Sequence, residues 1–276
     1  MKVKFHYGYP IDIDIDCNKP VDVYIDQFVA ELVPAGSLRI VILQEPWRDP
    51  LVPLVQKYQN CYTHLLTYQE DILDSNPKAR LFHFPNTWIK NYVPKPKEFS
   101  ISTVIGGKNF PQLEGHKLRH ELWRNRERIN IPRKFYLSGN AQHSHAFVHF
   151  DGADYTGQLV LGASKKPLFD SMFHICIENT SIDNYFSEKL IDCFQTQTIP
   201  IYYGCRNIGE YFNQMGIIQV GSLDQIIEVC NQLTPESYER MSPILEENLE
   251  LSNKWCDQDE QLKNGITLIL KEENLL

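Results

Sequence analysis

A short polar stretch after an apolar run combines the side chains that could hold a nucleotide: Glu178, Asn179, Tyr185, Glu188 and Lys189. The preceding run, 173–177, is apolar and predicts a buried strand. Glu188 and Lys189 then open a predicted helix at the carboxyl edge of the sheet, where open α/β sheets bind ligands. A carboxylate there can accept two hydrogen bonds from a ribose diol, and an ammonium beside it can hold a phosphate. The stretch therefore predicts a site for a nucleoside diphosphate.

A second group of charges surrounds Arg119. Residues 108–134 contain eight lysines and arginines against three glutamates, in a chain whose net charge is −8. Most of these cations fit a solvated helix face, here predicted over 118–128. Arg119 differs because it follows the glycine-rich loop 106–116 near the start of that helix, where backbone N–H groups and the helix dipole favour an anion. Lys108, in the same loop, is a candidate secondary phosphate contact.

Two motifs could suggest a metal site, but an interpretation without a metal is preferred for both. "IDIDIDC" (11–17) contains Asp-x-Asp pairs, but alternating Ile and Asp is what a half-buried strand or extended edge produces without a metal. "HSHAFVH" (143–149) places His143, His145 and His149 at face-sharing intervals, yet no carboxylate or cysteine at ligand spacing completes a tetrahedral set. No metal site is predicted.

Composition limits the class of protein. At 276 residues and 42% apolar content the chain can bury a sizeable core, and its acidity argues against a general nucleic-acid or anionic-membrane binder. No 18-residue apolar run predicts membrane insertion, and the start lacks a signal-peptide pattern. Seven scattered cysteines without a CxxC pair indicate reduced thiols. These features predict a soluble cytoplasmic protein.

Strand-like and helix-like segments alternate along the chain and predict an α/β fold. The strands are expected at 21–25, 38–43, 81–84, 101–105, 173–177, 199–203 and 217–220, and amphipathic helical stretches at 53–58 and 69–73. Two further helices are predicted from their start signals, which are Ser222 with Gln225 three residues later and Thr234 before Pro235. "VPKPKEF" (93–99) is the best linker candidate, which divides the chain into domains 1–95 and 96–255 and a C-terminal helix at 256–276.

Three segments of the sequence resemble motifs of a known family. "FHICIENTSIDNYFSEKLIDCFQTQTIPIYYG" (173–204) resembles the donor-site motif of the α-1,3-fucosyltransferases, glycosyltransferase family 10. That pattern is a strand ending in Glu-Asn, a Tyr-x-Ser/Thr-Glu-Lys loop, a helix, and a strand ending in Pro-x-x-x-Gly. "GHKLRHELW" (115–123) resembles the family's helix with a phosphate-binding arginine, which points to Arg119. "VILQEPW" (41–47) resembles the strand that precedes the catalytic carboxylate, which points to Glu45, although Pro46 departs from the usual residue.

The resemblance implies a GT-B architecture, with two Rossmann-like domains facing across a cleft, the first for the acceptor and the second for the donor. It implies inverting transfer of L-fucose from GDP-fucose to a hydroxyl of an acceptor glycan, with an α-1,3 linkage and no metal or other cofactor. Glu45 would be the catalytic base, Arg119 and Lys189 would hold the diphosphate, and Glu188 the ribose. Asn179 and Tyr185 would line the pocket, while Glu178 either faces the fucose or supports the loop.

Two alternatives stay open. An exostosin-like GT-B transferase using a UDP-sugar shares the order strand, polar loop, helix and Pro-ended strand, but that group usually carries an arginine in place of Glu188-Lys189. A non-catalytic glycan- or nucleotide-binding protein on the same fold would bind GDP without turnover. The acceptor, the oligomeric state and the role of residues 135–165 are not predicted. The missing membrane anchor suggests a bacterial or viral enzyme of glycan biosynthesis.

Overall fold

The structure is a computed structural model, which describes residues 1–46, 51–138, 157–159 and 164–276. The chain forms two compact units: residues 1–85 with 183–185 and 257–276, and residues 86–182 with 186–256. The change of unit falls after Pro85, ten residues before the predicted boundary. The predicted C-terminal helix exists and belongs to the first unit, because its apolar side covers that unit's sheet.

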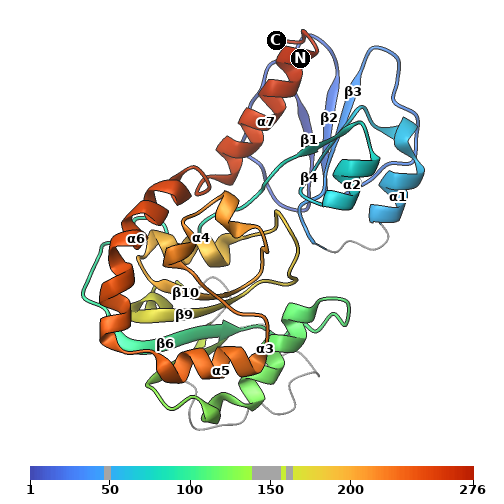
Figure 1. Cartoon of the computed structure of the whole chain (residues 1–276). Helices are drawn as coiled ribbons and strands as arrows, with labels where there is room; N and C mark the ends of the chain where they lie inside the picture. The colour runs from blue at the N-terminus through green and yellow to red at the C-terminus, as the bar shows by residue number, and fades with distance from the viewer. Residues whose placement is uncertain (47–50, 139–156, 160–163) are drawn as a thin grey trace. The chain divides into compact units, whose positions relative to one another are not determined.

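The first unit is a parallel sheet between helices. Its strands pair in the order β1-β2-β3-β4-β5, and all five are parallel. The strands are β1 (Lys4–His6), β2 (Val21–Ile25), β3 (Leu38–Ile42), β4 (His64–Thr67) and β5 (Ala79–Leu81). The helices are α1 (Leu51–Lys57), α2 (Glu70–Ser75) and α7 (Gln258–Glu272), with a 3-10 turn at Gln59–Cys61. Figure 1 shows α7 along one face of the sheet and α1 and α2 on the other.

Alternation along β3 explains this sandwich. Ile40 and Ile42 belong to the apolar cluster that includes α7, whereas Val41 belongs to the cluster of α1 and α2. Successive side chains of a strand point to opposite faces, so a continuous apolar run is buried on both sides. The predicted strands at 21–25 and 38–43 and both predicted helices are thereby confirmed.

The observed strands of this unit differ from the predicted ones in two respects. The strands β1 and β4 were missed, because three-residue β1 is too short to show a period and β4 begins with a histidine. The strand expected at 81–84 instead runs over Ala79–Leu81. Residues 11–17 confirm the extended-edge interpretation, although they form no named strand. Ile15 and Cys17 are buried, Asp14 and Asp16 form exposed ion pairs with Lys2, and Asp16 makes an isolated bridge to Lys2.

The second unit contains a parallel sheet whose strand order reverses. Its order is β11-β10-β9-β6-β7-β8, so β6 and β9 are neighbours although they are the first and fourth strands of the unit. This is the dinucleotide-binding order 3-2-1-4-5-6. The strands are β6 (Glu98–Ile105), β7 (Arg133–Ser138), β8 (Gly157–Leu159), β9 (Ser171–Ile177), β10 (Ile199–Tyr203) and β11 (Ile218–Gln219).

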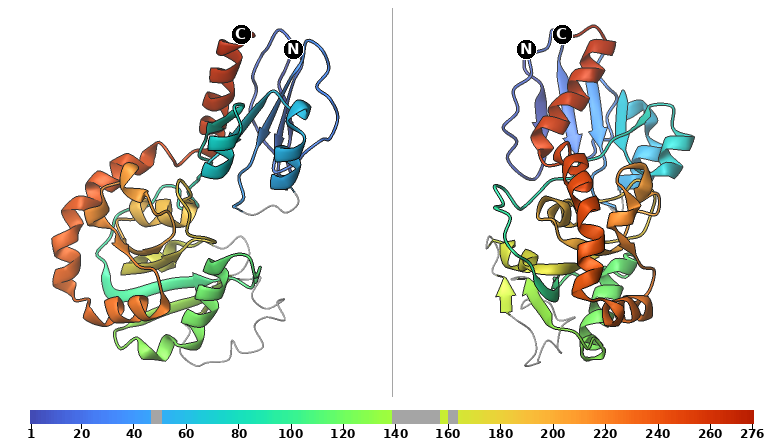
Figure 2. Two further views of the ribbon diagram at one scale, coloured as in Figure 1. Left: turned by 45° about the vertical axis from the view of Figure 1, so that its right-hand side comes forward. Right: turned by 60° about the vertical axis from the view of Figure 1, so that its left-hand side comes forward.

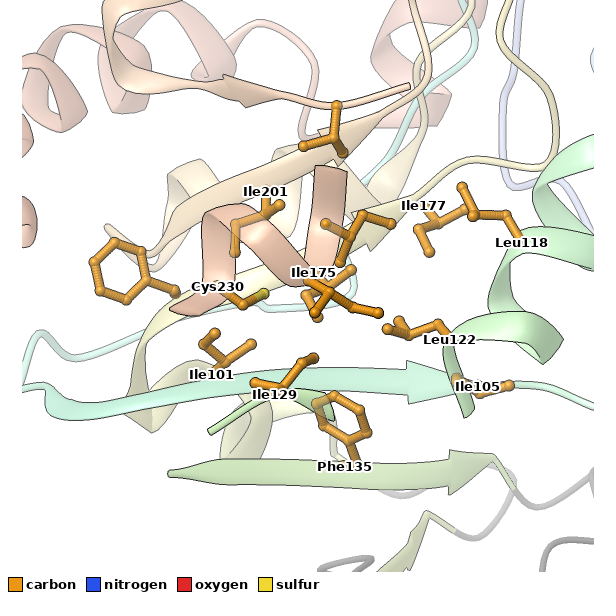
Figure 3. Packing of buried hydrophobic residues seen from close by; sticks show 14 of the residues in the cluster. Ile101, Ile105, Leu118, Leu122, Ile129, Phe135, Ile175, Ile177, Ile201 and Cys230 are labelled. Carbon is orange, nitrogen blue, oxygen red and sulfur yellow. The ribbon is translucent and has the colours of Figure 1, made fainter. Parts of the chain in front are cut away.

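Helices cover both faces of this sheet. They are α3 (Glu114–Arg124), α4 (Glu188–Gln195), α5 (Leu223–Gln232) and α6 (Pro235–Asn253), with 3-10 turns at Arg126–Arg128, Lys166–Asp170, Ile208–Glu210 and Gln214–Gly216. One core packs α3 and α5 against the strands, as Figure 3 shows, and a second core packs α4. The two views of Figure 2 show α6 running beside the strands of this unit.

Helix starts follow local signals. Ser222 accepts a hydrogen bond from the Gln225 N–H, and Thr234 forms a capping box with Ser237, which confirms both predicted helices. The helix expected at 118–128 instead begins at Glu114 and ends at Arg124. Arg119 is therefore in its second turn rather than at its start, beyond the first turn in which the helix dipole favours an anion.

None of the helices in the described parts of the chain is long and apolar enough to cross a bilayer.

We predict that Leu122→Ala lowers the free energy of unfolding by about 2–5 kcal/mol, because the side chain is fully buried among Ile105 and Ile175 and its removal leaves a cavity. Urea denaturation measures the change. Met215→Ala, at a side chain that is 72% exposed, is the control and should stay within about 0.5 kcal/mol of the wild type. Equal losses in the two variants would contradict the assigned core.

Candidate functional site

The reversal of strand order in the second unit defines a place for a ligand. Ligands of open α/β sheets bind outside the carboxyl ends of the strands at the point where the order reverses. Here that point lies between β6, which ends at Ile105, and β9, which ends at Ile177. The segments leaving these two strands lead into α3 and α4. They carry the residues that the sequence singles out.

Glu178, the first residue after β9, is fully buried. Its Oε1 accepts a hydrogen bond of 2.8 Å from the Ser187 N–H, and its Oε2 accepts one of 2.7 Å from the Ser187 hydroxyl. The Lys189 ammonium lies 3.4 Å from the same Oε2. Of the two roles left open for Glu178, these contacts are those of loop support.

Glu188 and Lys189 form a partly exposed ion pair at the start of α4. Lys189 Nζ lies 3.2 Å from Glu188 Oε1 and donates a 2.9 Å hydrogen bond to Ser187 Oγ. The two side chains are 23% and 27% exposed, so both can still meet a ligand. Ser187 is the N-cap of this helix, since its side chain accepts from the Lys189 N–H.

The charges around Glu188 keep it ionised. Burial alone would raise its pKa, but attraction by Lys189 and Lys165 outweighs burial and lowers the pKa of Glu188 to about 2. Burial likewise opposes the charge of Lys189, whereas Glu188 and Glu178 favour it and leave the pKa of Lys189 above its usual range. At neutral pH the site therefore presents a carboxylate acceptor beside a permanent cation.

Lys165 is a charged neighbour that the sequence analysis missed. Its Nζ lies 4.0 Å from Glu188 Oε1 and 4.9 Å from the centre of the Trp88 ring. It belongs to a segment without a recognisable motif, so no local signal could have identified it.

Arg119 reaches the same strand end from α3. Its Nε and Nη2 donate to the Ile177 carbonyl at 3.1 and 2.6 Å, and Nη2 also donates to Asn179 Oδ1 at 2.8 Å. The helix can approach this closely because residue 115 is glycine: a Cβ there would lie 1.8 Å from the Glu178 carbonyl oxygen. The Gly115 N–H donates to the Asn179 carbonyl at 3.0 Å. These contacts orient the guanidinium at the carboxyl edge of the sheet.

His116 is a second missed residue of the site. Its Nδ1 accepts from the Phe110 N–H at 3.1 Å, so the proton resides on Nε2, which lies 3.2 Å from Asn179 Oδ1. Burial, assisted by the charge of Arg119, lowers the pKa of His116 to about 4. A neutral histidine thus fixes the Asn179 amide. The pair Gly115-His116 at the start of α3 was the only local indication in the sequence. A histidine in that position does not by itself show that its ring is buried and neutral.

The remaining predicted residues separate into two groups. Lys108 is exposed in the segment between β6 and α3, and its charge acts on His116. Glu45 and Tyr185 belong to the first unit: Glu45 follows β3, and the Tyr185 ring is 6% exposed and lies 5.1 Å from the Tyr68 ring. The structure therefore places Arg119 in the second unit with Glu178, Asn179, Glu188 and Lys189, and it assigns Glu45 and Tyr185 to the first unit.

Within the residues that the structure describes, no three His, Cys, Asp or Glu side chains lie together as they would to hold a metal ion. His143, His145 and His149 lie outside the described residues.

Comparisons with known proteins were made for both the sequence and the fold. No family model matches the chain. A stretch of 61 residues is 40% identical to the α-(1,3)-fucosyltransferase FucT of Helicobacter pylori, and the match spans 22% of this chain and 13% of that protein. The predicted resemblance to α-1,3-fucosyltransferases is thereby confirmed.

Solved structures of similar fold include two of an α1,3-fucosyltransferase. One has a TM-score of 0.52 and 15% identity over 91% of this chain and 78% of its own. Another, with GDP, has a TM-score of 0.51 and 16% identity over 90% and 77%. α,α-Trehalose 6-phosphate synthase from Burkholderia multivorans gives 0.58 and 10% identity over 93% and 71%. These likenesses confirm the predicted α/β fold of GT-B type.

We predict that His116 stays neutral down to about pH 4, because its charged form is buried beside Arg119. In the unfolded chain histidine titrates near pH 6.5, so unfolding takes up a proton below that pH. Stability should therefore fall as the pH falls from about 6.5 to about 4.

Imidazole nitrogen NMR shifts measure the midpoint and the tautomer, for which we expect the proton on Nε2. The matched variant His116→Gln should show a smaller loss of stability over the same range. A His116 midpoint near pH 6.5 would contradict the buried contacts described above.

Proposed function

We propose that this chain is an inverting glycosyltransferase that transfers L-fucose from GDP-fucose to a hydroxyl of an acceptor glycan. The observation that carries the proposal is the group of Glu188, Lys189 and Arg119 at the strand reversal of a dinucleotide-binding sheet. Its support comes from the local identity to a fucosyltransferase and from the structure of an α1,3-fucosyltransferase of similar fold with GDP.

In this proposal each donor contact follows from the chemistry of its residue. The ionised Glu188 carboxylate accepts hydrogen bonds from the two ribose hydroxyls. Lys189 and Arg119 are fixed cations for the diphosphate, the first as a point charge and the second with several N–H donors. Lys108, exposed on the adjoining segment, adds a further cation. Glu178 holds the loop and has no direct contact with the donor.

The transfer itself is a single in-line displacement. Glu45 removes the proton from the acceptor hydroxyl while the oxygen of that hydroxyl forms a bond to C1 of fucose. The bond between C1 and the phosphate oxygen breaks on the opposite face, and the electron pair leaves with GDP. Lys189 and Arg119 stabilise the negative charge that develops on the diphosphate, so we propose that no metal is required.

The nucleotide can be tested by thermal stabilisation. We predict that GDP stabilises the protein and UDP does not, since a ligand that binds only the folded state at 100 times its dissociation constant adds about 2.7 kcal/mol. Differential scanning fluorimetry with GDP, UDP and ADP measures this. Stabilisation by UDP in preference to GDP would instead favour the exostosin-like alternative. GDP binding without hydrolysis or transfer of GDP-fucose would favour a non-catalytic binding protein.

The two cations can be tested by substitution. We predict that Lys189→Met and Arg119→Met each lower kcat/KM for GDP-fucose by about 100- to 1000-fold, because each removes a fixed charge that stabilises the transition state. Turnover is measured by release of GDP in the presence of N-acetyllactosamine.

Lys117→Met is the matched control. Lys117 lies on the same helix as Arg119, its side chain is 79% exposed, and its nearest acidic partner is 3.9 Å away. Its removal should leave kcat/KM within about threefold, since exposed pairs contribute little. Lys189→Met removes the cation beside the buried Glu178 carboxylate and leaves that carboxylate its hydrogen bonds from Ser187. Circular dichroism therefore checks that this variant still folds. Full activity in either site variant would refute the assigned donor site.

A further inference from the structure

The carboxyl ends of three neighbouring strands in the first unit are tied together by side chains. Tyr7 follows β1, Asp26 follows β2, and Gln44 and Glu45 follow β3. Because these strands are adjacent and parallel, their ends meet at one edge of the sheet. This group was not identified in the sequence, where only Glu45 was singled out.

Asp26 is the centre of this group. Its N–H donates to the Ile42 carbonyl at 2.9 Å, which continues the pairing of β2 with β3. Its backbone then adopts the left-handed conformation, with φ of 49°, which non-glycine residues other than Asn and Asp rarely occupy. The turn directs its carboxylate back to the segment after β3. There Oδ1 accepts from the Gln44 N–H at 2.9 Å and from the Glu45 N–H at 3.2 Å.

A second contact secures the same segment through the Gln44 side chain. The Tyr7 hydroxyl donates to Gln44 Oε1 at 2.8 Å. Burial, with the negative charges of Asp26 and Glu45, raises the pKa of Tyr7 to about 12. Tyr7 is therefore protonated at neutral pH and remains a donor. Gln44 is held at its main chain by Asp26 and at its side chain by Tyr7.

Glu45 itself lies outside any helix or strand, in a bend that follows β3. Its main-chain N–H donates a hydrogen bond to the side chain of Asp26, a residue whose own backbone N–H continues the sheet pairing. A base must come within about 2.6–3.2 Å of the proton that it removes, so the placement of its backbone bears directly on rate. A displacement of about 1 Å can cost about 100-fold in rate.

We propose that Asp26 is a positioning residue for Glu45, holding the main chain of the catalytic base through its two hydrogen bonds to Gln44 and Glu45. The inference rests on the proposed function and extends it to a residue that does not touch the substrate. Its acceptor geometry, and not its charge, performs the role. Tyr7 supports the same segment through Gln44.

Two substitutions separate the hydrogen bonds from the other properties of Asp26. Asp26→Asn retains an oxygen acceptor and tolerates the left-handed backbone. Asp26→Gly also tolerates that backbone but removes the acceptor. Asn274→Gly is the matched control, because Asn274 is an exposed residue of the same unit that also has a left-handed backbone, with φ of 56°. Its carbonyl accepts from Asn18, which precedes β2, whereas Asp26 follows that strand. Glu45→Gln sets the activity that remains without the base.

The measurements are kcat and KM for GDP-fucose with N-acetyllactosamine, and hydrogen exchange of the Gln44 and Glu45 amides. We expect Asp26→Gly to lower kcat by about 100-fold with KM unchanged, because only the position of the base is lost. Both amides should exchange faster in this variant. Asp26→Asn should restore kcat to within about threefold of the wild type and restore slow exchange, since an amide oxygen replaces the carboxylate oxygen as acceptor. Asn274→Gly should change neither quantity.

Several results would overturn the proposal. Equal loss of kcat in Asp26→Asn and Asp26→Gly would assign the role to the charge. A rise in KM alone would indicate a contact with the donor, and unchanged kcat in Asp26→Gly would exclude positioning. Absence of fucosyl transfer by the wild type would refute the proposed function but not the positioning by Asp26. In that case amide exchange alone tests the positioning, and unchanged exchange of the Gln44 and Glu45 amides in Asp26→Gly would refute it.

Discussion

The buried carboxylate of Glu178 is the constraint on which the donor end of the second unit depends. A fully buried charge is costly unless it is paired and hydrogen-bonded. Here Ser187 donates twice and Lys189 supplies the opposite charge. The end of β9 is thereby bound to the N-cap of α4, nine residues along the chain from Glu178, and the positions of Glu188 and Lys189 follow from that attachment. The end of β10 is also close, since a Cβ at Gly204 would lie 2.6 Å from Glu178 Cγ.

The next residue, Asn179, performs the corresponding task for α3. Its carbonyl accepts from Gly115, and its side-chain oxygen accepts from Arg119 and a neutral His116. Two successive residues therefore attach two helices to one strand end, at the reversal of strand order. Cations held in this way do not need to reorganise when charge develops on a ligand, which is the condition under which electrostatic stabilisation is most effective. The rigidity of the loop and its proposed chemistry share one cause.

The first unit solves a similar problem with different residues. Its described strands follow one another in sequence order, so its sheet edge is defined by consecutive strand ends rather than by a reversal. Asp26 leaves the pairing of β2 in a left-handed turn and binds the segment after β3. In both units a buried or half-buried carboxylate holds main-chain N–H groups beside a residue with a proposed chemical role. The supporting carboxylate is distinct from the one assigned to the chemistry.

The sequence alone determined the features that local pattern controls. Predominantly apolar runs predicted β2, β3, β9 and β10, and capping residues predicted the starts of α5 and α6. The spacing from Asn179 to Glu188 indicated the resemblance to a donor-site motif. Short strands such as β1, and the true start of α3, were missed because they depend on neighbours in space. Only the tertiary structure decided which carboxylates support the loops, that His116 is neutral, and that Arg119 is oriented by a residue 60 positions away. Periodicity reports burial and capping within a few residues, whereas hydrogen bonds between distant segments exist only once the sheets have brought those segments together.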